Sequence, residues 1–322
     1  MDTKERIRTF IGAEPAKRIM QLEPRDIACL SELRLRADKP MFARLSGQDY
    51  AFSAQGKTQI IDKNTYRPSA ADIAETIERI SQYSFYAFES ELCMGYITLP
   101  GGHRVGVAGQ AVIENGTVRA WRHISCINFR VAHAIKGCAD PVMHYIFDEN
   151  SNIQTQCSKS QAMHTMIISP PGCGKTTLLR DIVRQISDGT HTRLGLTVGL
   201  VDERSEVAGC FRGIPQNDIG QRTDVLDGCP KAEGMIMLLR SMAPDVIAVD
   251  ELGSQSDANA VETVLTAGVK LLCTAHGNSL DDIKKNPALK ALVNQKIFDR
   301  YVVLNAPGQA PLILDQECKI LK

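Results

Sequence analysis

The chain has 322 residues, enough for two domains of about 150 residues each, and 43% of them are apolar, which excludes wholesale disorder. The 37 Lys and Arg residues balance the 37 Asp and Glu residues. A neutral chain gives no overall electrostatic attraction to nucleic acid or to an anionic membrane surface.

Targeting and redox signals favour the cytoplasm. The first residues are charged and are not followed by the apolar segment of a signal peptide. No stretch approaches the roughly 18 apolar residues of a membrane-spanning helix. The ten Cys residues are scattered without C-x-x-C spacing, which gives no zinc-site pattern and is typical of a reducing compartment. We therefore expect a cytoplasmic protein with no transmembrane segment, whose membrane contacts are peripheral.

Residues 1–148 are expected to form an α+β domain. The first 40 residues begin with helix-like apolar patches, and alternation of Leu and Arg over 32–36 then predicts a strand with one buried face. The further elements expected here are a strand at 40–47, an amphipathic helix at 69–83 capped by Ser69, two strands between 95 and 112 joined at Gly101 and Gly102, and a strand at 124–131.

A mainly polar stretch at 149–160 is the expected linker between two domains. From 161 to 322, short apolar strands alternate with helices. This alternation predicts a second domain with a parallel sheet covered on both faces. The strands are expected at 164–168, 196–202, 246–249 and 269–274, and the helices at 176–187, 234–240 and 257–266.

The stretch from Ser169 to Thr176 matches the phosphate-binding pattern G-x-x-x-x-G-K-S/T everywhere except at Ser169, which replaces Gly. It lies between an expected strand and an expected helix. Gly172 and Gly174 would let successive backbone N–H groups face the phosphates of ATP. Lys175 would neutralise the β- and γ-phosphates, and the Thr176 hydroxyl would bind Mg²⁺. The expected nucleotide-binding residues are Ser169, Pro170, Pro171, Gly172, Cys173, Gly174, Lys175, Thr176 and Thr177.

Two carboxylates, Asp250 and Glu251, follow the apolar strand at 246–249. Successive residues at a strand end point to different sides, so one carboxylate can face a metal ion and the other water. We expect Asp250 to support Mg²⁺ and Glu251 to activate the attacking water. Because a phosphate-binding loop precedes them, this interpretation is favoured over a solvated acidic turn.

Another acidic strand end, Asp202-Glu203-Arg204, lies between these two motifs. An extra strand at this place favours the RecA-like branch of P-loop folds. The expected fold class is therefore α/β, with a RecA-like P-loop ATPase domain and a mostly parallel sheet, preceded by a smaller α+β domain. Glu203 would assist water or metal, or else form a structural ion pair with Arg204 or another neighbour.

Polar residues also follow the strand at 269–274. Thr274 and His276 are both placed to lie beside the γ-phosphate and sense its hydrolysis. The alternative for His276 is a hydrogen-bonded loop residue without a catalytic role.

Arginines matter because the transition-state charge on the γ-phosphate is often stabilised by an arginine of a neighbouring subunit. Arg240, at the end of a helix, is one catalytic candidate, and a helix cap or a surface ion pair is its alternative role. Spacing alone does not choose among the candidates, which are Arg104, Arg130, Arg204, Arg222 and Arg240.

Two segments, 238–253 and 273–279, resemble the type II and type IV secretion ATPases and pilus motors. Those proteins carry a phosphate-binding loop, an acidic box, an acidic strand end and a histidine box, which correspond here to 169–176, 202–204, 250–251 and 274–276. The runs 101–109, 214–220 and 222–231 are more specifically similar to the stage III sporulation protein AA family of endospore-forming bacteria. This second resemblance covers nearly the whole chain.

The resemblance implies a ring of identical subunits, a hexamer, that hydrolyses Mg-ATP bound between the N-terminal and RecA-like domains. It implies that the partners are membrane proteins of a secretion-like channel complex linking mother cell and forespore. The location implied is peripheral, at the inner membrane face of the mother cell. Two residues depart from the pattern: Ser169 replaces the first Gly, and Asp250 stands where many secretion ATPases have Gly.

Two other function classes share these motifs. A nucleic-acid-dependent RecA-like ATPase would use the same nucleotide site, but the neutral charge, the single Trp and the few aromatic residues give no strong nucleic-acid signal. A nucleotide-binding scaffold with little turnover would not need Glu251 as a water-activating carboxylate.

Overall fold

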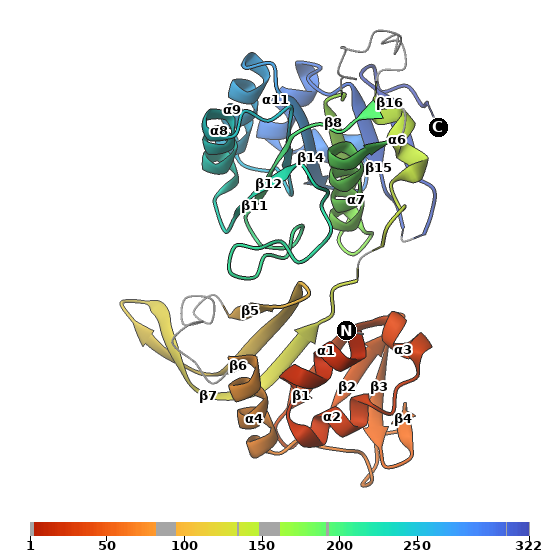
Figure 1. The fold of residues 1–322 in the computed structure, drawn as a ribbon, viewed down its shortest axis with the longest axis vertical. Coiled ribbons are helices and arrows are strands. Elements are labelled where there is room, and N and C mark those ends of the chain that lie inside the picture. The colour runs from red at the N-terminus through yellow and green to blue at the C-terminus, as the bar shows by residue number, and fades with distance from the viewer. Residues whose placement is uncertain are drawn as a thin grey trace. The chain divides into compact units, whose positions relative to one another are not determined.

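The computed structural model describes residues 3–81, 95–133, 135–147, 162–190, 193–306 and 308–321. The chain divides into two compact units, Met1–His133 and Ala134–Lys322 (Figure 1). The linker expected at 149–160 lies outside the described residues.

The division between the units falls before the boundary expected at 148. Helix α6 (Asp140–Ile146), which sequence patterning assigns to the first domain, packs in the core of the second unit. Val142 and Ile146 are buried there in one cluster with Ile182. A change in composition marks a polar stretch, but it does not show which core the preceding apolar helix joins.

The first unit is built on a seven-stranded antiparallel sheet with the order β4-β3-β2-β1-β7-β6-β5. Its strands are β1 (Leu30–Arg36), β2 (Phe42–Leu45), β3 (Gln48–Ser53), β4 (Gly56–Thr58), β5 (Tyr96–Leu99), β6 (His103–Glu114) and β7 (Thr117–Arg130). Its helices include α1 (Thr3–Phe10), α2 (Ala13–Ile19), α3 (Pro24–Ala28) and α4 (Ala70–Ile80). Leu33 and Leu35 of β1 are buried, as their alternation with Arg predicts.

Helix α4 begins where the sequence predicts. Ser69 is its N-cap: the Ser69 Oγ accepts a hydrogen bond from the Asp72 backbone N–H at 3.1 Å, and the Asp72 carboxylate accepts one from the Ser69 N–H in return. Ile73, Ile77 and Ile80 form its buried face. The helix ends at Ile80, and residues 82 and 83 of the expected helix lie outside the described part of the chain.

Strands β6 and β7 form a longer hairpin than the sequence patterns predict. Asn115 and Gly116 at its tip have φ of 51° and 77°, which matches the Asn-Gly signature of a tight two-residue turn. Within the described residues, β1 pairs with β7 over Cys126–Arg130, and β5 pairs with β6 over His103–Gly106. The outer part of the hairpin therefore pairs with itself as a projecting two-stranded ribbon (Figure 1).

The second unit contains a seven-stranded sheet with the order β12-β11-β13-β14-β8-β15-β16, parallel except for the last pair. Its strands are β8 (Thr165–Ser169), β11 (Val198–Asp202), β12 (Thr223–Asp227), β13 (Val246–Val249), β14 (Lys270–His276), β15 (Arg300–Val303) and β16 (Leu312–Asp315), beside a small ladder of β9 (Gly189–Thr190) and β10 (Arg193–Leu194). Besides α6, its helices include α7 (Lys175–Asp188), α8 (Lys231–Ser241), α9 (Gln255–Thr266), α10 (Leu280–Ile283) and α11 (Pro287–Asn294).

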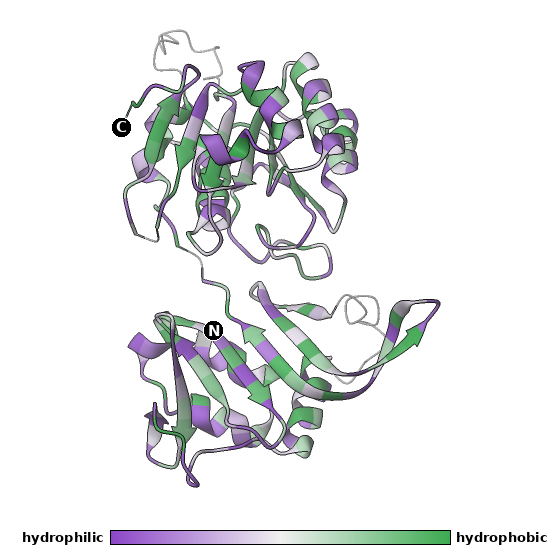
Figure 2. Ribbon diagram, turned by 180° about the vertical axis from the view of Figure 1, so that it is seen from behind, coloured by the Kyte–Doolittle hydropathy of each residue, from purple (hydrophilic) through white to green (hydrophobic). Residues whose placement is uncertain are grey.

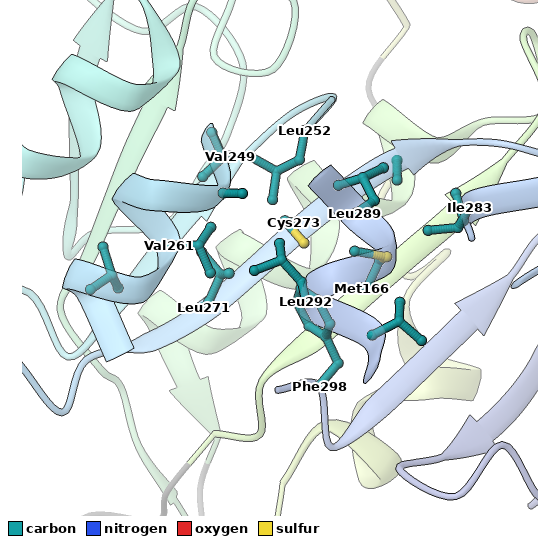
Figure 3. Close-up of a cluster of buried hydrophobic side chains, with 14 of the residues drawn as sticks. Met166, Val249, Leu252, Val261, Leu271, Cys273, Ile283, Leu289, Leu292 and Phe298 are labelled. Carbon is teal, nitrogen blue, oxygen red and sulfur yellow. The ribbon is translucent and has the colours of Figure 1, made fainter. Parts of the chain in front are cut away.

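Both faces of this sheet are covered, as the continuous apolar strands predict. Ile247 and Val249 belong to one core cluster, which includes residues of α9 and α11 (Figure 3). Val246 and Ala248 belong to the opposite cluster, with residues of α6 and α7. The strands of this unit are largely apolar, whereas its helices carry apolar and polar positions (Figure 2).

Helix α8 packs on β11 through Gly234. A Cβ at this position would lie 2.5 Å from Val201 Cγ1, a branched side chain with little freedom to move. We expect Gly234→Ala to lower the free energy of unfolding by about 1–3 kcal/mol, because overpacking outweighs the higher helix propensity of Ala. Urea denaturation followed by circular dichroism measures the change. Adding Val201→Ala to Gly234→Ala removes the clash, so the double variant should be at least as stable as Val201→Ala alone. A less stable double variant would contradict this packing.

Candidate functional site

The phosphate-binding loop has the backbone that its glycines predict. Gly172 and Gly174 have φ of 76° and 92°, in the left-handed region, and Gly174 is the N-cap of α7. Ser169 is the last residue of β8, where it is buried in extended conformation and its hydroxyl donates to the Pro170 carbonyl at 2.8 Å. Because an extended position does not require glycine, Ser169 fits where the pattern usually has Gly.

Strands β8, β14 and β13 bring the other predicted residues to the same edge of the sheet. The strand β14 pairs with β8 on one side and β13 on the other, all in parallel. The Thr176 hydroxyl donates to Asp250 Oδ2 at 2.9 Å, and the Thr274 hydroxyl donates to Asp250 Oδ1. Thr274 also accepts from the Glu251 N–H at 2.8 Å. The buried Thr274 therefore holds both carboxylate residues in place.

Glu251 is held by two cations. Lys175 Nζ donates to its Oε1, and Arg204 Nη1 donates to its Oε2 at 3.0 Å. Burial alone would raise the pKa of Glu251, but the hydrogen bond and charge of Lys175, with the charge of Arg204, outweigh burial and lower it. Glu251 also has a φ of 57°, which is unusual for a residue with a Cβ and frequent at functional sites.

Asp250 and Thr176 fit a Mg²⁺ ion. Their side-chain oxygens are hard donors of the kind this ion takes, and they already lie within hydrogen-bonding distance of each other. Burial raises the pKa of Asp250 despite hydrogen bonds from Thr274 and Thr176, so a cation beside it would offset an unfavourable environment for its charge.

The acidic end of β11 has two different roles. Asp202 is buried and accepts three backbone N–H groups, from Glu206, Val207 and Ala208, so it holds the following loop. Glu203 is exposed and forms an ion pair with Lys231 rather than with Arg204. A small pocket is lined by Asp202, Glu203, Arg204, Glu206, Lys231, Asp250 and Glu251.

Sequence reasoning missed Lys231 as part of this pocket. Lys231 is the first residue of α8, and its partner Glu203 is 28 positions away in the chain. No catalytic motif marks it, and β12, the strand that precedes α8, was not expected from the sequence either. The one sequence signal of Lys231 was its place in the run 222–231, which resembles the sporulation family.

His276 lies where a residue near the phosphates is expected. It is exposed, ends β14, and pairs with Ser169 at the start of the phosphate-binding loop. In the part of the chain that the structure describes, the His276 ring makes no hydrogen bond.

Arg240 does not lie near Glu251 of its own subunit. It is exposed in the last turn of α8, about 13 Å along the helix from Lys231, where the chain leads into the amino end of β13. Arg222 also precedes the amino end of its strand, and Arg104 and Arg130 are cross-strand partners in the first unit. Among the candidate arginines of the second unit, Arg204 is the one with a hydrogen bond to Glu251 in the described residues.

The sheet order and the contacts across its carboxyl edge define a RecA-like P-loop protein with the fold of secretion ATPases. Solved structures share this fold: the ATPase DotB of Legionella pneumophila has a TM-score of 0.52 and 17% identity over 85% of this chain and 71% of that one. The pilus retraction motor PilT, solved with bound ADP, has a TM-score of 0.51 and 15% identity, covering 89% and 78%.

The chain belongs to the family described as sporulation stage III, protein AA, whose model matches residues 1–319. It is 42% identical over 295 residues to the stage III sporulation protein AA of Bacillus subtilis, which covers 91% of this chain and 89% of that protein. The family resemblance noted in the sequence is thus confirmed. Across the described ranges, none of the helices is both long and apolar enough to span a membrane.

The Thr274 hydroxyl provides a test of the site's internal geometry. Thr274→Val keeps the side-chain shape but removes the bonds to Asp250 and Glu251, so we expect the free energy of unfolding to fall by about 1–3 kcal/mol. Thr274→Ser keeps the hydroxyl and is the matched control. Urea denaturation of both variants compares them, and equal stability of the Val and Ser proteins would show that these bonds contribute little.

Proposed function

We propose that the chain binds ATP in the loop Ser169–Thr177 and hydrolyses it as a Mg²⁺-dependent ATPase. The contact between the phosphate-binding loop and the acidic strand end carries this proposal, because Lys175 meets Glu251 and Thr176 meets Asp250. A cation, a hydroxyl and two carboxylates thereby converge, which are the parts that phosphoryl transfer to water requires. The ATPase fold neighbours support it.

In this mechanism, Lys175 leaves Glu251 and binds the β- and γ-phosphates of the substrate. Thr176 and Asp250 would hold Mg²⁺, which when bound neutralises charge on the phosphate oxygens. Thr274 keeps Asp250 in place for this task. Glu251, freed from Lys175, orients the attacking water and accepts its proton.

Two further residues have proposed roles at this edge. His276, at the end of β14 next to Ser169, is proposed to sense the γ-phosphate. Glu203 is proposed to assist the attacking water or the metal ion, with Lys231 holding its carboxylate in the lining of the pocket.

We also propose that the subunits form a ring, a hexamer, that powers a membrane-associated, secretion-like channel complex during endospore formation. Membership of a sporulation family and a fold shared with a pilus retraction motor support this. The partners proposed are membrane proteins of that complex. The ring would lie in the mother cell, peripheral to the inner membrane face.

Turnover by the purified full chain tests the proposal. We expect Lys175→Ala and Glu251→Gln each to lower kcat by about a hundredfold or more, because each removes a group aimed at the reacting phosphate or water. Lys290→Ala, an exposed lysine of α11, is the matched control and should leave kcat unchanged. A coupled phosphate-release assay gives kcat, and mass photometry with and without a non-hydrolysable ATP analogue gives the subunit number.

Wild-type turnover no higher than that of Lys175→Ala, even with membrane components present, would contradict the ATPase proposal and leave a nucleotide-binding scaffold. Turnover that requires single-stranded DNA or RNA would instead indicate a nucleic-acid-dependent ATPase.

Arg240 is proposed to act on the site of a neighbouring subunit, since it is exposed at the opposite edge of the sheet from its own Glu251. We expect Arg240→Ala and Lys175→Ala proteins to be inactive alone and partly active when mixed, because a hybrid ring contains sites with an intact loop and an intact neighbouring arginine. The phosphate-release assay on mixtures of known ratio measures this. A mixture with only the summed activities of its components would exclude Arg240 from this role.

A further inference from the structure

Arg204 and Lys175 hold the two oxygens of the Glu251 carboxylate, but they are not equivalent. Lys175 is the first residue of α7 in the phosphate-binding loop, so a bound polyphosphate draws it away from Glu251. Arg204 follows β11, on a loop outside the phosphate-binding loop, and keeps Glu251 Oε2 at 3.0 Å. After Lys175 leaves, Arg204 is the cation among the described residues that remains hydrogen-bonded to this carboxylate, with the charge of Lys231 farther away.

The loop that carries Arg204 is held in place from the side of β11. The Asp202 carboxylate accepts the backbone N–H groups of Glu206, Val207 and Ala208 at 2.9, 3.1 and 2.8 Å. Ser205, next to Arg204, has a φ of 51° and donates its hydroxyl to Asp227. These bonds fix a tight turn immediately after Arg204.

The same loop is also held from the side of the phosphate-binding helix. Arg180 of α7 is half-buried, and its Nε and Nη2 donate to the carbonyls of Val207 and Glu206 at 2.6 and 2.8 Å. A planar guanidinium that binds two successive carbonyls in this way restricts the movement of both. The backbone around Arg204 is therefore tied both to the acidic strand and to the helix that begins at Lys175.

We propose that Arg204 is a positioning residue for Glu251: it keeps the carboxylate on the water side of the site when Lys175 transfers to the nucleotide. The inference rests on the ATPase function proposed above and adds the residue that aims the water-activating group. It also separates two arginine tasks, since Arg204 acts within its own subunit and Arg240 is placed for a neighbour.

A positioning role differs from a structural one in what a substitution changes. The Arg204 side chain is 66% exposed, and ion pairs at such exposure contribute little to the free energy of unfolding. Loss of Arg204 should therefore leave the fold and nucleotide affinity intact. Misdirection of Glu251 should appear in kcat, because a displaced catalytic group affects the chemical step.

The kinetic experiment compares Arg204→Gln, Arg204→Lys and Arg212→Gln in the full chain. Arg212 is an exposed arginine of the same loop, stacked on Phe211, so its substitution removes the same charge away from Glu251. We expect Arg204→Gln to lower kcat about ten- to a hundredfold with KM changed less than about twofold. Arg204→Lys should recover a part of kcat, and Arg212→Gln should leave kcat unchanged. The thermal unfolding temperature should be the same in the variants and the wild type.

A structural readout tests the inference without turnover. In a crystal or cryo-electron microscopy structure with Mg²⁺ and a non-hydrolysable ATP analogue, Lys175 should contact the phosphates and Arg204 should still contact Glu251. Loss of the Arg204–Glu251 contact in that structure, or an Arg204→Gln effect equal to that of Arg212→Gln, would overturn the proposal. Absence of turnover in the wild type with the contact retained would instead reject only the proposed hydrolysis.

Discussion

The parallel register of β8, β14 and β13 is the constraint on which the site depends. Because these strands run in one direction and lie side by side, their carboxyl ends meet at one edge of the sheet. The phosphate-binding loop leaves β8 there, Thr274 and His276 end β14, and Asp250 and Glu251 follow β13. A buried hydroxyl of the middle strand, Thr274, bonds to both acidic residues after β13, and Thr176 of the loop after β8 bonds to Asp250, so side chains link all three strand ends.

The parts of the site that follow one another in the chain could be predicted from the sequence. The glycines and Lys-Thr of the loop, and the Asp-Glu pair, are each a local pattern with a local physical reason. The pairings of Arg204 with Glu251 and of Lys231 with Glu203 could not be predicted, because each joins residues from different strands or helices. Sequence spacing also did not distinguish Arg240 from Arg204 as the arginine of the site. In the structure, Arg204 contacts Glu251, whereas the direction of α8 places Arg240 at its far end.

The fold shows the same limit. Apolar strands alternating with helices predicted the parallel sheet, and Ser69 predicted the start of α4. The assignment of α6 to the second unit depends on packing with residues far along the chain, so it was not visible. The sequence patterns placed a turn at Gly101-Gly102 and ended the next strand at 112. The long β6–β7 hairpin was therefore missed, although Asn115-Gly116 signals a tight turn.

The ion pair between Lys175 and Glu251 also means that Glu251 competes with a nucleotide for the same lysine. A nucleotide whose phosphates bind Lys175 must displace this contact, and in the proposed ATPase the carboxylate would be available to take Lys175 back after hydrolysis. Binding to such a site is weaker than to one with an unpaired lysine, by the free energy of the lost pair. In the proposed ATPase, the same competition would favour departure of the product, so the glutamate proposed to activate water would also contribute to resetting the site for another cycle.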